Sequence, residues 1–95
     1  MAMSIQINQP SDVGRVIRAV RSTLDLRQDD TAHLSGVSEG FMLKLESGNP
    51  SVNMGKVMEV LASLGIKIEL TLPPGASMDE VMAKLTAKPA VKGKQ

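Results

Sequence analysis

The stretch Arg27 to Gly48, which reads R-Q-D-D-T-A-H-L-S-G-V-S-E-G-F-M-L-K-L-E-S-G, decides the fold of this 95-residue chain. Two short amphipathic segments flank Gly36-Val37-Ser38 at its centre. Gly36 can adopt the left-handed conformation that ends a helix. Val37 supplies an apolar residue between the segments, and Ser38 can cap the second by accepting a hydrogen bond from a free backbone N–H. The stretch therefore predicts two helices that meet at a tight turn.

Helices over 28–35 and 39–46 joined in this way form a helix-turn-helix, which presents its second helix to the DNA major groove. Base-reading side chains come from the start of that helix and from its outer face one turn later. The positions selected are Ser38, Glu39, Gly40, Leu43 and Lys44. Glu39 can accept a hydrogen bond from a cytosine amino group and Leu43 can touch a thymine methyl. A glutamate in a first helical turn is also favoured by the helix dipole alone.

The spacing resembles that of the Xre family of Cro/C1-type repressor domains, and within it the HipB-type antitoxins. The family pattern Q-x-x-x-A-x-x-x-G-V-S-x-x-x-x-x-x-x-E-x-G is matched by Gln28, Ala32, Gly36, Val37, Ser38, Glu46 and Gly48. The similarity covers roughly residues 10–73, because an arginine-bearing helix precedes the motif and L-A-S-L-G-I-K-I-E-L-T-L follows it. This last segment favours the HipB type, since most Xre domains close with another helix there. Thr31 departs from the family, which usually has leucine.

By this resemblance the fold is mainly α, a lambda-repressor-like bundle with one C-terminal strand that pairs across a homodimer. The protein is then expected to bind palindromic operator DNA as a dimer, to repress its own operon and to neutralise a HipA-type kinase toxin. Gln28 is expected to grip a phosphate, and Glu46 to be a structural acid. Further expected phosphate contacts are Arg18, Arg27, Ser47, Asn49 and Lys56.

Two alternatives stay open. One is a free-standing or phage-type Xre repressor without a toxin, which the absence of an adjacent toxin gene would indicate. The other is a helix-turn-helix interaction module that has lost DNA binding. The net charge of only +1 supports this second alternative, because nucleic-acid binders are often strongly basic. A salt-dependent shift with duplex DNA would exclude it.

Composition narrows the class of protein. A chain without cysteine has neither disulfides nor thiolate metal sites, which indicates a reducing compartment. With no leader pattern and no long apolar run, we expect a soluble bacterial cytoplasmic protein, nucleoid-associated when bound to DNA. The four arginines all lie between 15 and 27, so the amino half can carry a positive face. Phe41 is the only aromatic residue, which disfavours a single-strand reader that stacks bases.

Enzymatic chemistry is disfavoured. His33 is the only histidine and lies on the predicted outer face of a helix. Asp29 and Asp30 are consecutive, so their side chains diverge on a helix. The chain has no phosphate-binding glycine loop, no metal-ligand spacing and no nucleophile with a base. We therefore expect no catalytic residue, no metal and no cofactor.

The remaining chain divides into an arm (1–10), the helix-turn-helix domain (11–65), a dimerisation strand (66–73), and a short helix with a flexible basic tail (74–95). The first helix is expected over about 12–24 with Ser11 as N-cap; its apolar stripe is Val13, Val16, Ile17, Val20 and Leu24. A fourth helix over about 54–64 with Asn53 as N-cap should bury Val57, Met58, Leu61 and Leu64.

The predicted strand has strict alternation. Ile66, Ile68, Leu70 and Leu72 alternate with Lys67, Glu69 and Thr71. A lone strand leaves its backbone groups unpaired. The same strand from a second chain is the preferred partner, over an intrachain hairpin with residues 5–7. After Pro73-Pro74-Gly75 a short helix is expected over 78–86, with Ser77 as cap and an apolar face that docks on the domain or on a partner protein.

Overall fold

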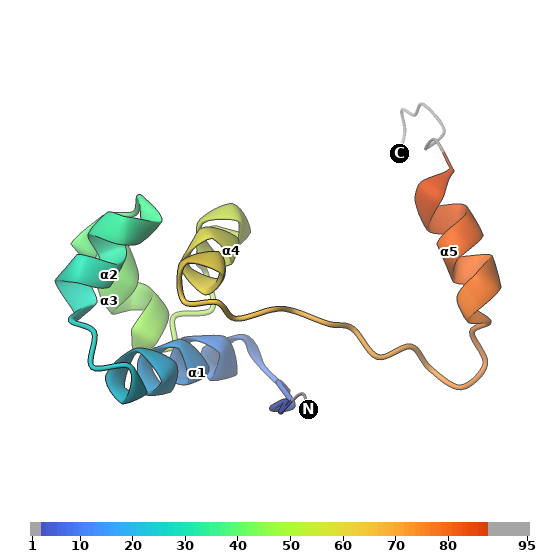
Figure 1. Cartoon of the computed structure of the whole chain (residues 1–95), viewed down its shortest axis with the longest axis horizontal. Helices are drawn as coiled ribbons and strands as arrows, with labels where there is room; N and C mark the ends of the chain where they lie inside the picture. Colours follow the sequence, from blue (N-terminus) through green and yellow to red (C-terminus); the bar gives the residue numbers. More distant parts are fainter. Residues whose placement is uncertain (1–2, 88–95) are drawn as a thin grey trace.

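The computed structural model describes residues 3–87, and the expected basic tail lies outside them. The helices are α1 (Pro10–Thr23), α2 (Gln28–Ser35), α3 (Glu39–Glu46), α4 (Met54–Ser63) and α5 (Met78–Thr86). The first four gather into one bundle, in which α3 packs against α1 and α2, and α2 packs against α4 (Figure 1). The mainly α class with a helix-turn-helix is confirmed. No helix within the described range is both long and apolar enough to span a bilayer.

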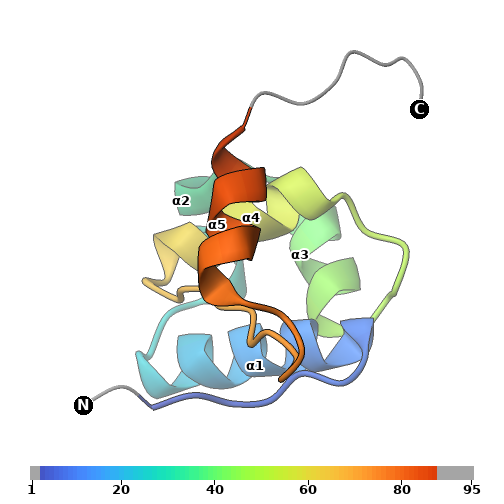
Figure 2. The same ribbon diagram turned by 90° about the vertical axis from the view of Figure 1, so that its right-hand side faces the viewer.

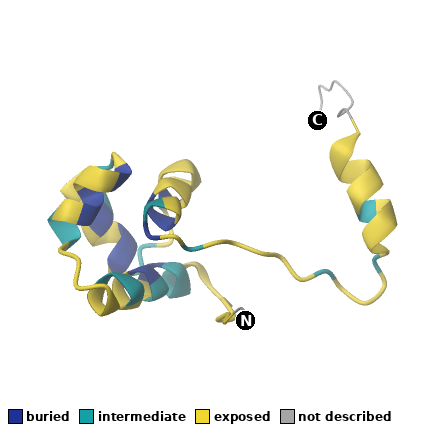
Figure 3. Cartoon of the chain, in the orientation of Figure 1, coloured by how far each residue is buried: buried dark blue, intermediate teal, exposed yellow. Residues whose placement is uncertain are grey.

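The core lies between these four helices, where their buried faces meet (Figure 3). Its members are Ile17, Ala32, Met42, Leu45, Val57, Val60, Leu61 and Leu64. Two predicted core residues are wrong: Leu24 is 52% exposed and Met58 is 47% exposed. Leu24 follows the last residue of α1 and so leaves the helical stripe. Met58 had been expected on the buried face of α4. Val60, which was not predicted to be buried, lies on that face instead and is fully buried.

Helix ends follow local chemistry. Gly36 ends α2 with a φ of 73°, and the Ser38 hydroxyl accepts a hydrogen bond from the Phe41 N–H at 3.0 Å. Asn53 caps α4 in the same way, also at 3.0 Å. Ser11 is not the N-cap of α1, because the helix already begins at Pro10. A proline fits the first helical position, where its missing N–H is no loss.

A close helix contact brings α1 against the end of α3. A Cβ added to Gly14 would lie 1.8 Å from the Leu45 carbonyl oxygen, so only glycine allows the two backbones to approach this closely. Gly48, just after α3, has a φ of 89° and faces Ser11 across the same contact. This approach fixes where α3 sits on the bundle.

The predicted strand is not present as a strand: within residues 3–87 no β-structure forms. Residues 66–73 run as an extended segment away from the bundle (Figure 1). Ile66 packs against the core, whereas Ile68 is 51% and Leu70 85% exposed. The physical reason is that a strand is defined by a hydrogen-bonded partner, and the intrachain hairpin with residues 5–7 does not form.

Helix α5 stands apart from the bundle at the far end of this extended segment, and its surface is almost entirely exposed (Figure 3). The Ser77 hydroxyl accepts a hydrogen bond from the Glu80 N–H, as predicted for the cap. The helix therefore does not dock on its own domain, one of the two options that the sequence left open.

Candidate nucleic-acid interface

Helix α3 has one exposed and one buried face. The predicted base-reading positions are all exposed: Ser38, Glu39, Gly40, Leu43 and Lys44. Met42 and Leu45, on the opposite face, are buried. Leu43 is the unusual member, because a leucine that is 61% exposed in the middle of a short helix contributes little to the core. The helix is thus held by its inner face and offers its outer face to a partner.

A buried ion pair ties α3 to α1 and α2. The Arg21 guanidinium donates to both Glu46 carboxylate oxygens at 2.7 and 2.8 Å, and its third nitrogen donates to the Leu26 carbonyl at 2.8 Å. The Gln28 amide nitrogen donates to the same carboxylate at 3.0 Å. The hydrogen bonds that Arg21 donates to the Glu46 carboxylate raise the pKa of Arg21. Glu46 is 6% exposed, so the prediction of a structural acid is confirmed.

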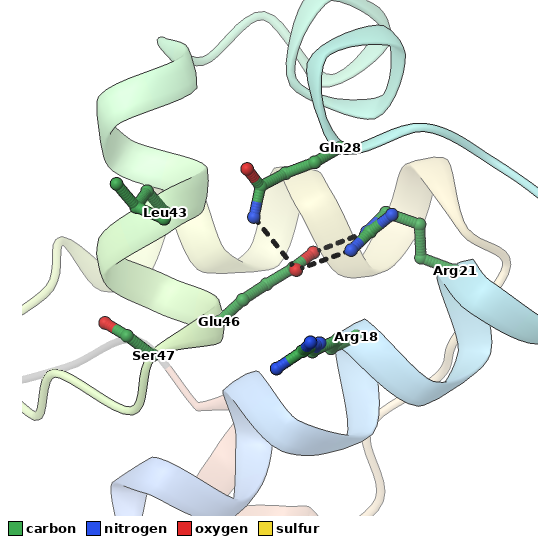
Figure 4. Close-up of a pocket in the computed structure, with 6 residues that line it drawn as sticks. All are labelled: Arg18, Arg21, Gln28, Leu43, Glu46 and Ser47. Atoms are coloured by element: carbon green, nitrogen blue, oxygen red, sulfur yellow. Dashed lines mark hydrogen bonds and ion pairs between the residues drawn. The ribbon is translucent and has the colours of Figure 1, made fainter.

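Around this ion pair lies a surface depression of about 270 Å³, shown in Figure 4. It is lined by Arg18, Arg21, Gln28, Leu43, Glu46 and Ser47. Four of the predicted DNA-contacting residues therefore come together from three helices and the end of α3. Arg18 is exposed and, within residues 3–87, forms no hydrogen bond or ion pair. Its charge is available at the rim, beside the outer face of α3.

Arg27 has acidic neighbours of its own. Its guanidinium donates to both Asp29 oxygens at 3.0 Å and lies 4.0 Å from Asp30. These bonds raise the pKa of Arg27 and lower the pKa of Asp29, and the nearby Glu39 carboxylate adds to the effect on Arg27. Arg27 was expected to contact phosphate, and its side chain is 76% exposed. Its positive charge is, however, partly neutralised by the carboxylate of Asp29.

The other predicted phosphate contacts surround α3. The Ser47 hydroxyl donates to the Lys44 carbonyl, and the Asn49 carboxamide oxygen accepts from the Ser51 N–H at 2.7 Å. Lys56 places its ammonium 5.6 Å from the centre of the Phe41 ring, within range of a cation–π contact. Gln28 is half-buried and uses one amide N–H on Glu46, which leaves one for another acceptor.

Sequence reasoning missed two residues that position the interface. Arg21 was one of the four arginines expected to give the amino half a positive face, yet its side chain is only 15% exposed. The available signal was Glu46 itself, because a buried carboxylate needs a cationic partner. Gly14 was also missed, and a glycine within a predicted helix is the signal that could have indicated a close backbone approach. Among the described residues, no cluster of three potential metal ligands is present.

Comparison with known proteins identifies the family. The chain is 41% identical over 71 residues to y4mF of Sinorhizobium fredii (strain NBRC 101917 / NGR234), an uncharacterized HTH-type transcriptional regulator, with 75% of this chain and 93% of that protein covered. No protein-family model matches the chain.

Solved structures share the fold. A chain of a HipA–HipB–O2–O3 complex is 20% identical with a TM-score of 0.66, and a chain of a HipB–O4 20mer complex is 18% identical with a TM-score of 0.67. Each alignment covers 72% of this chain and 96% of the other. The Xre-type fold expected from the sequence is thus found in the described structure and in its neighbours. Together with the identity to y4mF, this shows that the chain belongs to the HTH-type transcriptional regulators.

Proposed function

We propose that this regulator is a DNA-binding repressor that reads palindromic operator DNA with the outer face of α3. The observation that carries the proposal is the exposure of Ser38, Glu39, Gly40, Leu43 and Lys44 beside Arg18 of α1, which has no hydrogen-bond or ion-pair partner among residues 3–87. Glu39 would accept from a cytosine amino group and Leu43 would contact a thymine methyl. Gly40, without a side chain, leaves room for a base edge.

Phosphate contacts would flank these base contacts and fix the register. Arg18 and Ser47 lie at one end of α3, around the depression, while Lys56 lies against Phe41. Gln28 would contribute its free amide N–H, and Asn49 its amide nitrogen. Arg27 would contribute less than the sequence indicated, because Asp29 already holds its guanidinium.

The active species would be a homodimer joined through residues 66–73. Ile66, Ile68, Leu70 and Leu72 supply one apolar face of an extended segment, most of which is exposed in the single chain. Pairing this segment with its copy about a two-fold axis would satisfy its backbone groups and bury that face. A symmetric dimer also suits a palindromic site.

The partner proposed beyond DNA is a HipA-type kinase toxin, which the protein would restrain while repressing the operon that encodes both. The support is the likeness of fold to HipB in a HipA–HipB–operator complex. Co-purification with the product of an adjacent kinase-like gene tests this part alone. A free-standing repressor would show DNA binding without such a partner.

The experiment for the DNA proposal is titration of the protein with duplex from its own promoter region at several salt concentrations, with a scrambled duplex of equal length as control. We expect tighter binding to the promoter duplex and a steep loss of affinity with salt. Equal affinity for both duplexes would contradict base reading by Glu39 and Leu43. Binding to neither duplex would favour a helix-turn-helix interaction module, for which the pairing of Arg27 with Asp29 is the supporting observation.

A further inference from the structure

Helix α5 carries an apolar face that nothing in its own bundle covers. Met78, Val81, Met82 and Leu85 recur at spacings of three and four, which aligns them on one side of the helix. Met78 is 61%, Met82 47% and Leu85 72% exposed. A helix of nine residues is marginal in water by itself, because helix nucleation is unfavourable and few hydrogen bonds follow it. Such a helix gains stability when its apolar face is packed.

The bundle has an apolar groove on the side that faces α5. The groove measures about 390 Å³ and lies between the N-terminal arm and α1. Its apolar lining is Ile5, Ile7, Val16, Ala19 and Val20. Figure 2 looks at the bundle from the side of α5, and in this view the N-terminal arm runs alongside α1, below it. Ile5 is 69% and Ile7 43% exposed. A helix packed over the groove would therefore also bury apolar side chains of the N-terminal arm.

The geometry of the dimer decides which bundle α5 can reach. In an antiparallel pair centred on Glu69, residue 72 of one chain lies opposite residue 66 of the other. Ile66 is packed against its own core, directly after α4. The chain that leaves the paired segment at residue 72 therefore does so beside the partner's bundle. Residues 73–77 can then span at most about 18 Å before α5 begins.

We propose that the two chains exchange their C-terminal helices: α5 of each protomer lays its apolar face into the partner's groove between the N-terminal arm and α1. This inference rests on the proposed dimer and adds a second interface to it. The match between α5 and the groove is apolar. At the rim, Arg15 is 75% exposed but lies 3.8 Å from the carboxylate of Asp12, which also lines the groove. The exchange gives residues 74–87 and the N-terminal arm one common role, which is to lock the dimer.

A cross-linking experiment tests the exchange directly, since the full chain has no cysteine of its own. One copy carries Met82→Cys on α5, and a second, differently tagged copy carries Ala19→Cys in the groove. The copies are mixed, equilibrated and oxidised mildly. A matched control pairs Met82→Cys with His33→Cys, because His33 is exposed on α2 and does not line the groove.

We expect a mixed-tag covalent dimer with Ala19→Cys and little with His33→Cys. Equal yields in the two pairs would overturn the proposal. A chain carrying both Met82→Cys and Ala19→Cys that closes a disulfide within itself, without a covalent dimer, would also overturn it, because α5 then docks on its own bundle. The mass of the unmodified protein in solution distinguishes failure of the exchange from failure of the dimer. If the protein is a dimer but no cross-link forms, only the exchange of α5 is refuted. If the protein is a monomer, the proposed dimer itself is refuted.

A second pair of variants measures the contribution of α5 to dimer affinity. Met82→Asp places a charge on the apolar face, and Ala83→Asp places the same charge on the opposite face of the same helix. If the face is buried in the partner, Met82→Asp should raise the dimer dissociation constant by about tenfold or more, because a charge and a lost apolar contact both oppose burial. Ala83→Asp should change it less than about threefold. Equal effects of the two variants would contradict the exchange.

Discussion

At the scale of single residues, the ion pair of Arg21 and Glu46 holds together the surface proposed to bind DNA. Its two partners lie in α1 and at the end of α3, and Gln28 adds a contact from α2. The three helices thus meet on one carboxylate. Since Glu46 is 6% exposed, the strength of this link depends on both charges being present.

Replacing Arg21 by Leu should lower the free energy of unfolding by about 3 kcal/mol, because it leaves a buried carboxylate without its cation. The double variant Arg21→Leu with Glu46→Leu should lose clearly less than the sum of the two single losses. Urea unfolding of all four proteins provides the comparison. Additive losses would show that the two side chains do not act as a pair.

Gly14 fixes the approach of α1 to α3. Gly14→Ala would bring a methyl group to 1.8 Å from the Leu45 carbonyl oxygen, so the helices must move apart. We expect a loss of about 2 kcal/mol or more in unfolding free energy, as for other overpacked contacts. Gly40→Ala, on the open face of α3, is the control and should be neutral or slightly stabilising. Similar losses in both variants would contradict the packing argument.

Arg18 should contribute to DNA affinity through charge. Arg18→Ala is expected to weaken binding to promoter and scrambled duplexes alike, and to reduce the slope of log affinity against log salt by about one. Arg15→Ala removes the same charge from an α1 position outside the depression, so its slope should stay near that of the unaltered protein. Equal slopes for the two variants would remove Arg18 from the interface.

At the scale of elements, the start of α1 depends on a carboxylate. The Asp12 side chain accepts hydrogen bonds from the N–H groups of Asn8 and Gln9 at 3.0 and 3.3 Å. The bond from Asn8 is the main cause that lowers the pKa of Asp12 from its usual 3.8. These bonds favour the charged form, so their stabilisation is complete above the unfolded-state pKa and disappears as pH falls through the lower folded-state value.

The free energy of unfolding should therefore decrease as pH falls below about 4, with part of that decrease due to Asp12. In the Asp12→Asn variant the free energy of unfolding should depend less steeply on pH over this range, since the side chain no longer titrates. Thermal unfolding at several pH values between 2 and 6 measures both slopes. Parallel curves for the two proteins would exclude Asp12 as a contributor.

The sequence predicted most elements because their signals are local. Gly36 and the caps Ser38, Asn53 and Ser77 each specify one helix end through bonds within a few residues. The errors concern burial, the start of α1 and long-range partners. Met58 and Leu24 have apolar side chains at helical spacing, but the positions of neighbouring helices leave both exposed. The strand expected over residues 66–73 finds no pairing partner within residues 3–87, and α1 begins at Pro10, before the expected cap Ser11. The partner of Glu46 was likewise not identified, because the contact joins residues 25 positions apart.

At the scale of the whole molecule, the chain has two parts with different roles. The four-helix bundle buries its own core, whereas residues 66–87 expose apolar side chains along an extended segment and a helix. A small domain of this kind gains stability from association. The two apolar surfaces support the proposed dimer, in which one symmetric body would carry both α3 helices.

Leu70→Asp should shift the protein towards monomer, because this side chain, 85% exposed in the single chain, would lie opposite Ile68 of the second chain, next to the two-fold axis. Thr71→Asp introduces the same charge on the other face of the segment and should leave most of the dimer intact. Light scattering coupled to size exclusion gives both masses. Unchanged mass in Leu70→Asp would contradict pairing through residues 66–73.

DNA reading by a dimer through α3 is tested by the stoichiometry and affinity of the complex that the protein forms with its own promoter duplex. We predict two chains bound per palindromic site, with a duplex containing one half-site bound much more weakly at the same salt. Leu43→Asp, which preserves the inner face of α3, should remove the preference for the promoter. One chain per site, or a promoter affinity equal to that for scrambled duplex, would contradict a dimer that reads DNA with α3.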